Sequence, residues 1–163
     1  MSALFDEWTK LAEHIGEVCV AEKRIIVGAE SCTGGLIAAV LTSVSGSSAW
    51  LDRTFVTYSN EAKMEMLGVS AQTLDQFGAV SSETACEMAA GAFRTGRATM
   101  AYSVTGVAGP TGGTLTKPVG MVCFGFATVQ GVSAVTRHFK GDRSAVREQS
   151  VNFVLGELAR KSG

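Results

Sequence analysis

The chain has 163 residues, a length that suits one domain with a single substantial core, and we treat residues 1–163 as that domain. Apolar residues make up 46% of the sequence and charged residues 18%, which excludes the disordered and fibrous classes of protein. The formal net charge of −1, without a long basic block, argues against nucleic acid and membrane surfaces as partners and favours a small, weakly charged ligand.

The predicted elements of the N-terminal half alternate between helices and strands. The opening helix is amphipathic, because its apolar residues recur three or four positions apart, and it lacks the basic start and apolar centre of a secretory signal. "RIIVGA" and "RTFVTYS" have the composition of strands, and "GGLIAAVLTSV" has that of a helix. Three more helices follow: "NEAKMEML" capped by Asn60, "SAQTLDQFG" ending at Gly78, and "SSETACEMAAGAFRTG" starting with Ser82.

The C-terminal half contains three predicted strands, a long loop and a final helix. "ATMAYSVTG" is the first strand, and "PVGMVCFGFATVQGVSAVTRHF" forms two strands with a hairpin at Gln130-Gly131. The last helix starts at an Asp142 cap. This order predicts an α/β fold, a three-layer α/β/α sandwich with a mixed, mostly parallel sheet of about five to six strands.

Two polar loops, "AESCTGG" and "TGVAGPTGG", directly follow predicted strands. In α/β sheets, ligands gather at the carboxyl ends of parallel strands. If these two strands are parallel neighbours, the two loops therefore share one crevice.

Ser31 lies on the first of these loops, just before a predicted helix. The unpaired N–H groups at a helix start can hold a phosphate or an oxyanion, so Ser31 could be a nucleophile. The alternative is that Ser31 or Thr33 only caps the helix, and the segment matches none of the common nucleotide or hydrolase motifs. These local residues leave the two interpretations open.

A nucleophilic serine needs a base. His14 and His138 are poorly placed for this role, and a partly desolvated lysine is the alternative. Lys63 stands out because "YSNEAK" puts it and Tyr58 at a second strand-to-helix junction, although the pattern alone favours an ordinary exposed lysine on a short helix.

The cysteines and histidines show no metal-site spacing. Cys19, Cys32, Cys86 and Cys123 are scattered singly, and the two histidines are far apart. We therefore expect reduced thiols in a cytoplasmic protein, with no metal and no cofactor.

The motifs "AESCTGG", "GSSAW", "TYSNEAK", "GAVS", "TGVAGPTGG", "KPVG" and "GDR" occur in the order seen in the CinA C-terminal domain family, which the chain resembles from about Val27 to the final helix. The resemblance implies an amidohydrolase without metal that converts nicotinamide mononucleotide to nicotinic acid mononucleotide and ammonia in pyridine-nucleotide salvage. It also implies Ser31 as nucleophile, Lys63 as base and Tyr58 as proton relay. Ser48 is expected to assist, with Ser47 nearly as plausible.

Substrate binding is expected from both loops and from the last helix. Backbone N–H groups near Cys32, Thr33 and Gly34, or from "TGVAG", would stabilise the oxyanion, Gly35 is expected to contact the substrate, and helix capping is assigned to Thr33. Arg143 would pair with phosphate, and Lys117 is a further candidate. The residues expected around ribose or phosphate are Thr105, Gly106, Ala108, Gly109, Gly112 and Gly113.

Several alternatives stay open at this point. Cys32 could itself be the nucleophile, Arg143 could lie in a solvated first turn, and the glycines could only shape turns. The whole domain could be a non-catalytic nucleotide or phosphate sensor. The apolar stripe that includes Trp8 could form a dimer face or an internal core. Larger family members carry a further N-terminal domain with a metal-dependent pyrophosphatase activity, which we do not expect here.

Overall fold

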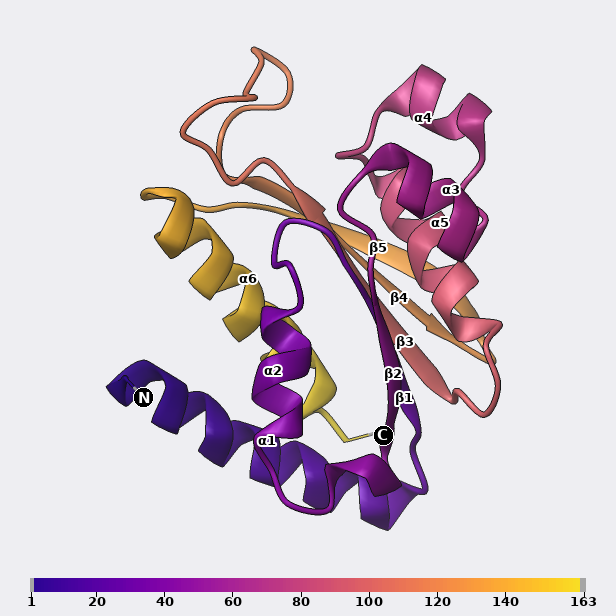
Figure 1. Cartoon of the computed structure of the whole chain (residues 1–163), viewed down its shortest axis with the longest axis vertical. Coiled ribbons are helices and arrows are strands. Elements are labelled where there is room, and N and C mark those ends of the chain that lie inside the picture. Colours follow the sequence, from indigo (N-terminus) through magenta and orange to yellow (C-terminus); the bar gives the residue numbers. More distant parts are fainter. Residues whose placement is uncertain (1, 162–163) are drawn as a thin grey trace.

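The fold is built around one five-stranded sheet with the strand order β2-β1-β3-β4-β5 (Figure 1). The computed structural model describes residues 2–161. β1 pairs in parallel with β2 and β3, whereas β4 runs antiparallel to both β3 and β5. The strands are β1 (Ile26–Glu30), β2 (Leu51–Val56), β3 (Met100–Gly106), β4 (Met121–Thr128) and β5 (Gly131–His138).

The predicted α/β fold with a mixed sheet is confirmed, but the prediction of a mostly parallel sheet is wrong. A parallel neighbour needs a crossover connection, usually a helix. Helices lie between β1 and β2 and between β2 and β3, but no helix lies between β3 and β4. β4 and β5 are joined by a tight turn at Val129 and Gln130, one position earlier than expected, so both of these pairs are antiparallel.

Helices cover both faces of the sheet (Figure 1). One face carries α1, α2 and α6, and the other carries α3, α4 and α5. No helix within residues 2–161 is both long and apolar enough to cross a lipid bilayer. The helices are α1 (Ala3–Glu22), α2 (Leu36–Thr42), α3 (Asn60–Leu67), α4 (Ala71–Phe77), α5 (Ser82–Phe93) and α6 (Arg143–Leu158), and a 3-10 turn, η1 (Ser47–Ala49), precedes β2.

Hydroxyl and carboxylate side chains cap these helices. Ser59, rather than Asn60, caps α3 by accepting a hydrogen bond from the N–H of Ala62 at 3.0 Å. Asp142 caps α6 as predicted and accepts from the N–H of Ala145 at 2.9 Å. In both places the capping residue has an extended backbone, which is why the cap lies just outside the helical segment.

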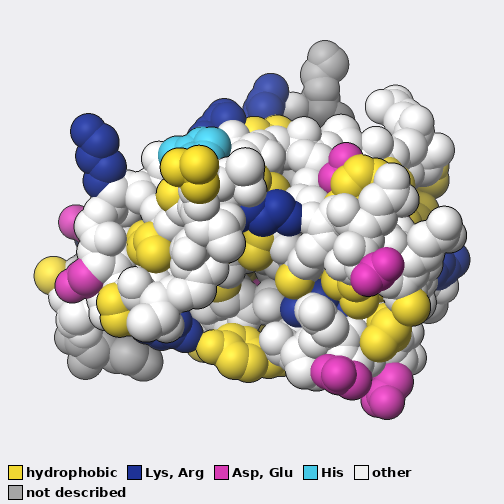
Figure 2. All heavy atoms as spheres, turned by 90° about the horizontal axis from the view of Figure 1, so that it is seen from above, with side chains coloured by type: hydrophobic (Ala, Val, Ile, Leu, Met, Phe, Trp, Pro, Cys, Tyr) yellow, Lys and Arg dark blue, Asp and Glu magenta, His cyan; other side chains and the backbone are white. Residues whose placement is uncertain are grey.

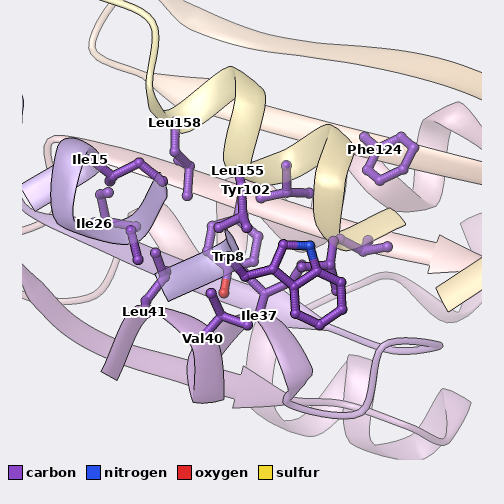
Figure 3. Packing of buried hydrophobic residues seen from close by; sticks show 14 of the residues in the cluster. Trp8, Ile15, Ile26, Ile37, Val40, Leu41, Tyr102, Phe124, Leu155 and Leu158 are labelled. Atoms are coloured by element: carbon purple, nitrogen blue, oxygen red, sulfur yellow. The ribbon is translucent and has the colours of Figure 1, made fainter. Parts of the chain in front are cut away.

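Two apolar clusters fill the spaces between the layers. The larger lies under α1, α2 and α6, where Trp8 and Ile37 pack together (Figure 3), and the smaller, with Val27 and Met88, lies on the other face. Trp8 is 5% exposed and its indole N–H donates to Asn152 Oδ1 at 2.6 Å. The apolar stripe of the opening helix is therefore core and not a free dimer face.

The alternation of side chains along β1 positions the residues that follow it. Ile26 belongs to the larger cluster and Val27 to the smaller one, because successive strand residues point to opposite faces. At the end of the strand, Glu30 contacts the start of α2, while Ser31 contacts Lys63 of α3.

Candidate active site

Ser31 lies immediately beyond β1, in a turn that is tied to the sheet. Its N–H donates to the carbonyl of Val104 at 2.9 Å, and its own carbonyl accepts from the N–H of Gly34 at 3.0 Å. The side chain is 8% exposed. The serine hydroxyl is therefore held at the carboxyl end of the two parallel strands β1 and β3.

Lys63 points from the first turn of α3 toward this serine. Its Nζ lies 3.1 Å from Ser31 Oγ, 3.0 Å from the Thr57 carbonyl and 3.5 Å from the Ser59 carbonyl. The lysine is 1% exposed, and burial lowers the pKa of its ammonium group.

As an ammonium, Lys63 donates to three acceptors, Ser31 Oγ and the carbonyls of Thr57 and Ser59, and loss of one proton changes only the contact with the serine. A neutral amine has two N–H bonds and one lone pair. The two carbonyls of Thr57 and Ser59 can accept the two N–H bonds, which leaves the lone pair for the hydroxyl proton of Ser31. The geometry therefore suits transfer of that proton to Lys63.

A cleft of about 200 Å³ opens in front of this pair. Figure 2 shows this end of the molecule, where Lys and Arg side chains lie beside a hollow near the middle of the face. The cleft brings together both polar loops, so the expectation of one shared crevice is confirmed. It is lined by Ser31, Cys32, Tyr58, Asn60, Lys63, Ala79, Val80, Thr105, Gly106, Ala108 and Arg143.

Arg143 and Tyr58 meet at the mouth of the cleft. The Arg143 guanidinium donates to the Gly109 carbonyl at 2.7 Å and to the Tyr58 hydroxyl at 2.9 Å. Tyr58 is 62% exposed, and its hydroxyl makes no hydrogen bond to Ser31 or Lys63 within residues 2–161. The structure therefore joins the tyrosine to the arginine rather than to the serine and lysine.

Comparison with known proteins places this arrangement in a family. The sequence matches the model of the CinA C-terminal domain over residues 8–162. The chain belongs to the CinA C-terminal domain family.

Relatives of this CinA domain include the nicotinamide-nucleotide amidohydrolases PncC of Escherichia coli strain K12 and of Enterobacter agglomerans. They are 50% and 51% identical to it over 153 residues, and each alignment covers 93% of both chains. A solved structure of the competence/damage inducible protein CihA from Agrobacterium tumefaciens matches with a TM-score of 0.88 at 45% identity, over 93% of each chain.

Several residues predicted for the site lie outside the cleft of the CinA domain. Ser47 and Ser48 precede Leu51, which pairs with Ile26 at the start of β1, whereas Ser31 follows the end of that strand. Within this chain Ser48 therefore lies at the opposite end of β1 from Ser31 and does not line the cleft, and its assisting role stays a prediction.

The outer part of the glycine-rich loop also lies away from the cleft lining. Gly112 and Gly113 are exposed, and Lys117 Nζ contacts the carbonyl of Phe77 instead of the cleft. Lys117 was a candidate phosphate contact because it follows the glycines in sequence. The loop carries it to α4, which sequence distance alone does not reveal.

The turn after Ser31 leaves the cleft lining beyond Cys32. Gly34 and Gly35 have φ angles of 57° and 94°, so both glycines are needed for the reversal of the chain into α2. Thr33 is buried and does not cap α2, because its hydroxyl donates to the carboxylate of Glu30 at 2.7 Å. Neither glycine nor Thr33 lines the cleft.

This geometry limits which backbone N–H groups of the turn can donate to an oxyanion. The N–H of Gly34 already donates to the Ser31 carbonyl. The N–H groups of Cys32 and Thr33 donate to no acceptor in another residue of the described chain. Of these two residues only Cys32 lines the cleft, and an N–H group in its position beside the serine is the kind of donor that stabilises a tetrahedral oxyanion.

Cys32 is poorly suited to be the nucleophile. Burial, more than any other effect, raises the pKa of its thiol to about 12. The reactive form of a cysteine is the thiolate, so this side chain is a protonated and weakly nucleophilic thiol at neutral pH.

Five residues around the site were not predicted as site residues. Asn60, Ala79 and Val80 line the cleft, and the last two belong to the family motif "GAVS", which was the available signal. Glu30 and Arg147 contact the Ser31 turn from behind. A charged residue at the end of an apolar strand was the signal for Glu30, and no sequence pattern marks Arg147.

Larger hollows exist elsewhere on the chain but lack this chemistry. One of about 760 Å³ lies at the other end of the sheet beside Thr99 and Arg160, and one of about 590 Å³ runs along α1 beside Val20. Neither contains Ser31 or Lys63, so the small cleft is the better candidate in spite of its size.

Proposed function

We propose that the chain hydrolyses the carboxamide of nicotinamide mononucleotide to nicotinic acid mononucleotide and ammonia through an acyl-enzyme on Ser31. The observation that carries the chemistry is the 3.1 Å contact between Ser31 Oγ and a buried Lys63 Nζ. The substrate is taken from the relatives named nicotinamide-nucleotide amidohydrolase, which are about half identical over nearly the whole chain.

The first half of the reaction forms the acyl-enzyme. Ser31 Oγ attacks the carboxamide carbon while its proton moves to neutral Lys63 Nζ. The carbonyl oxygen becomes an oxyanion, for which we assign the N–H group of Cys32 as donor, since Cys32 lines the cleft. The carbon–nitrogen bond then breaks as the lysine ammonium returns its proton to the leaving nitrogen, which departs as ammonia.

The second half consumes one water molecule. Lys63 accepts a proton from this water as its oxygen attacks the ester carbon on Ser31. Collapse of the tetrahedral intermediate returns the proton to Ser31 Oγ and releases the acid product. We assign both proton transfers to Lys63 and place Tyr58 among the substrate-binding groups, because its hydroxyl already holds Arg143.

The cleft is sized for the reactive end of the substrate. Pockets that enclose a whole ligand usually measure about 300 to 1,000 Å³. At about 200 Å³, this cleft suits the nicotinamide ring, with the ribose and phosphate extending along Thr105, Gly106 and Ala108. Arg143 stands at the mouth, where its guanidinium can pair with phosphate oxygens.

The test is ammonia release from nicotinamide mononucleotide by the purified protein. Ser31→Ala should lower kcat by at least about 1,000-fold, since loss of a nucleophile removes the covalent route. Cys32→Ala tests the neighbouring thiol and should still release ammonia, since that thiol is protonated at neutral pH. Full activity of Ser31→Ala would contradict the serine mechanism. Saturable binding in calorimetry without ammonia release would instead indicate a nucleotide sensor.

A further inference from the structure

Glu30 is a carboxylate enclosed in the protein directly before the candidate nucleophile. It is 0% exposed and forms no ion pair within residues 2–161. Four uncharged donors surround it: the Thr33 hydroxyl at 2.7 Å, the N–H of Ile37 at 3.1 Å, the N–H of Ala38 at 2.9 Å and the Tyr102 hydroxyl at 3.2 Å. Burying a carboxylate costs free energy unless its oxygens are hydrogen-bonded, and these four donors offset that cost.

The role of Glu30 in the fold is to cap α2 from a neighbouring strand. The residue before α2 is Gly35, which has no side chain to accept a hydrogen bond. Glu30 accepts the N–H groups of Ile37 and Ala38 instead, and the same carboxylate holds Thr33. The segment between Glu30 and α2, which contains Ser31, is therefore fixed at both ends by one side chain.

The Arg147 side chain, from α6, donates hydrogen bonds to the backbone of the same turn. Its Nε donates to the Cys32 carbonyl at 3.1 Å, and its Nη2 donates to the Thr33 carbonyl at 3.2 Å. These two successive carbonyls follow the nucleophile directly. In a planar trans peptide the C=O and N–H point in opposite directions, so holding the Cys32 carbonyl also fixes the direction of the Thr33 N–H.

We propose that Glu30 and Arg147, together called the turn clamp, are positioning residues for the reaction of Ser31. The turn clamp keeps Ser31 Oγ within reach of Lys63 and keeps the peptide groups that follow it, including the Cys32 N–H, in a fixed orientation beside the cleft. It acts through the turn and does not touch the substrate. The proposal rests on the proposed function for its reaction, and its test below also has a readout that needs no nucleotide.

The first experiment replaces Arg147, which is half-buried and can be changed without opening the core. Arg147→Lys keeps the charge but not the two-pronged geometry, and Arg147→Met removes both. Both should lower kcat by about 10- to 100-fold with KM within about twofold of wild type, because a small misplacement of reacting groups has effects of this size. Arg137→Lys on β5 is the matched control and should keep full kcat.

Glu30→Gln tests the other half of the turn clamp. All four partners of Glu30 are hydrogen-bond donors. A Gln side chain replaces one acceptor oxygen by an NH2 donor, and the backbone N–H groups of Ile37 and Ala38 cannot accept a hydrogen bond from it. We expect the same loss of kcat at unchanged KM. If this variant does not fold, the Arg147 variants alone decide the outcome.

The second readout is the rate at which a serine-directed phosphonylating reagent labels Ser31, followed by intact mass. This rate should fall by about 10-fold or more in the Arg147 variants while far-UV circular dichroism stays unchanged. If labelling falls in the Arg147 variants but the wild-type protein releases no ammonia from nicotinamide mononucleotide, the result supports the turn clamp and contradicts the proposed substrate. Wild-type kcat and labelling in Arg147→Met, or in Arg147→Lys, would overturn the turn clamp. Failure of the wild-type protein to be labelled at Ser31 would also overturn it.

Discussion

Lys63 owes its proposed chemistry to its surroundings. Burial lowers the pKa of its ammonium group, and two backbone carbonyls accept the N–H bonds of the neutral amine. An ammonium has no lone pair, so only the deprotonated lysine can take the proton of Ser31.

The pH dependence of the reaction follows from this state. We expect kcat/KM to rise by about tenfold per pH unit on the acid side and to level off above the pKa of Lys63. Because that pKa is lowered, the midpoint should lie below the ordinary pKa of lysine. Steady-state rates of ammonia release across a pH series measure it, and Lys63→Arg, which stays charged throughout, should be inactive at every pH. A flat profile, or a midpoint at the ordinary pKa of lysine, would contradict the role of Lys63 as base.

At the scale of elements, the start of α6 closes one side of the cleft. Arg143 reaches from the first turn of this helix to the Gly109 carbonyl and to Tyr58. A guanidinium held in this way has little freedom to lose when it meets a phosphate group, so the arginine is well prepared for an anionic end of the substrate.

Replacement of this arginine should separate binding from chemistry. We expect Arg143→Met to raise KM for nicotinamide mononucleotide by about 10- to 100-fold, the effect of losing a charged hydrogen bond, with a smaller change in kcat. Initial rates with the nucleotide and with the corresponding nucleoside, which lacks the phosphate, provide the measurement. An equal rise in KM for the nucleoside would show that Arg143 does not act on the phosphate.

Replacing each of two helical glycines by alanine should change the stability of the protein in opposite directions. A Cβ on Gly91 of α5 would lie 2.0 Å from the Leu67 carbonyl at the end of α3, whereas a Cβ on Gly156 of α6 would meet nothing within 4 Å. Gly91→Ala should therefore destabilise the protein by about 1 to 3 kcal/mol through overpacking. Gly156→Ala should stabilise it by about 0.5 to 1 kcal/mol through its helical preference. Urea unfolding followed by circular dichroism compares the two, and equal shifts would contradict the contact.

The elements show which features the sequence could predict. Apolar periodicity, capping residues and strand composition predicted nearly every helix and strand, because these signals are local. Ser31 and Lys63 were found because each follows a strand with a polar turn, and their contact was an expectation from the family resemblance. Glu30 and Arg147 were missed as site residues, because most of their partners are backbone groups, which carry no sequence signature.

At the scale of the whole molecule, the mixed sheet explains where the cleft forms. β1 and β3 are parallel neighbours, so the turn at Ser31 and the loop after Gly106 emerge at the same edge. β4 and β5 return antiparallel and complete the sheet away from the reacting pair. We predicted the shared edge from the sequence but overestimated the number of parallel strand pairs. Nothing in the residues of the loop between β3 and β4 indicates that β4 returns antiparallel to β3.

Ser31 and Lys63 are 32 positions apart in the chain, and Arg147 lies 115 positions from Cys32. The turn that carries the nucleophile is thus held by a helix that leaves the ribosome only after all five strands have been made. An incomplete nascent chain without α6 would lack the two Arg147 hydrogen bonds to this turn. Hydrolytic capacity would then be acquired late in synthesis, as a property of the finished fold.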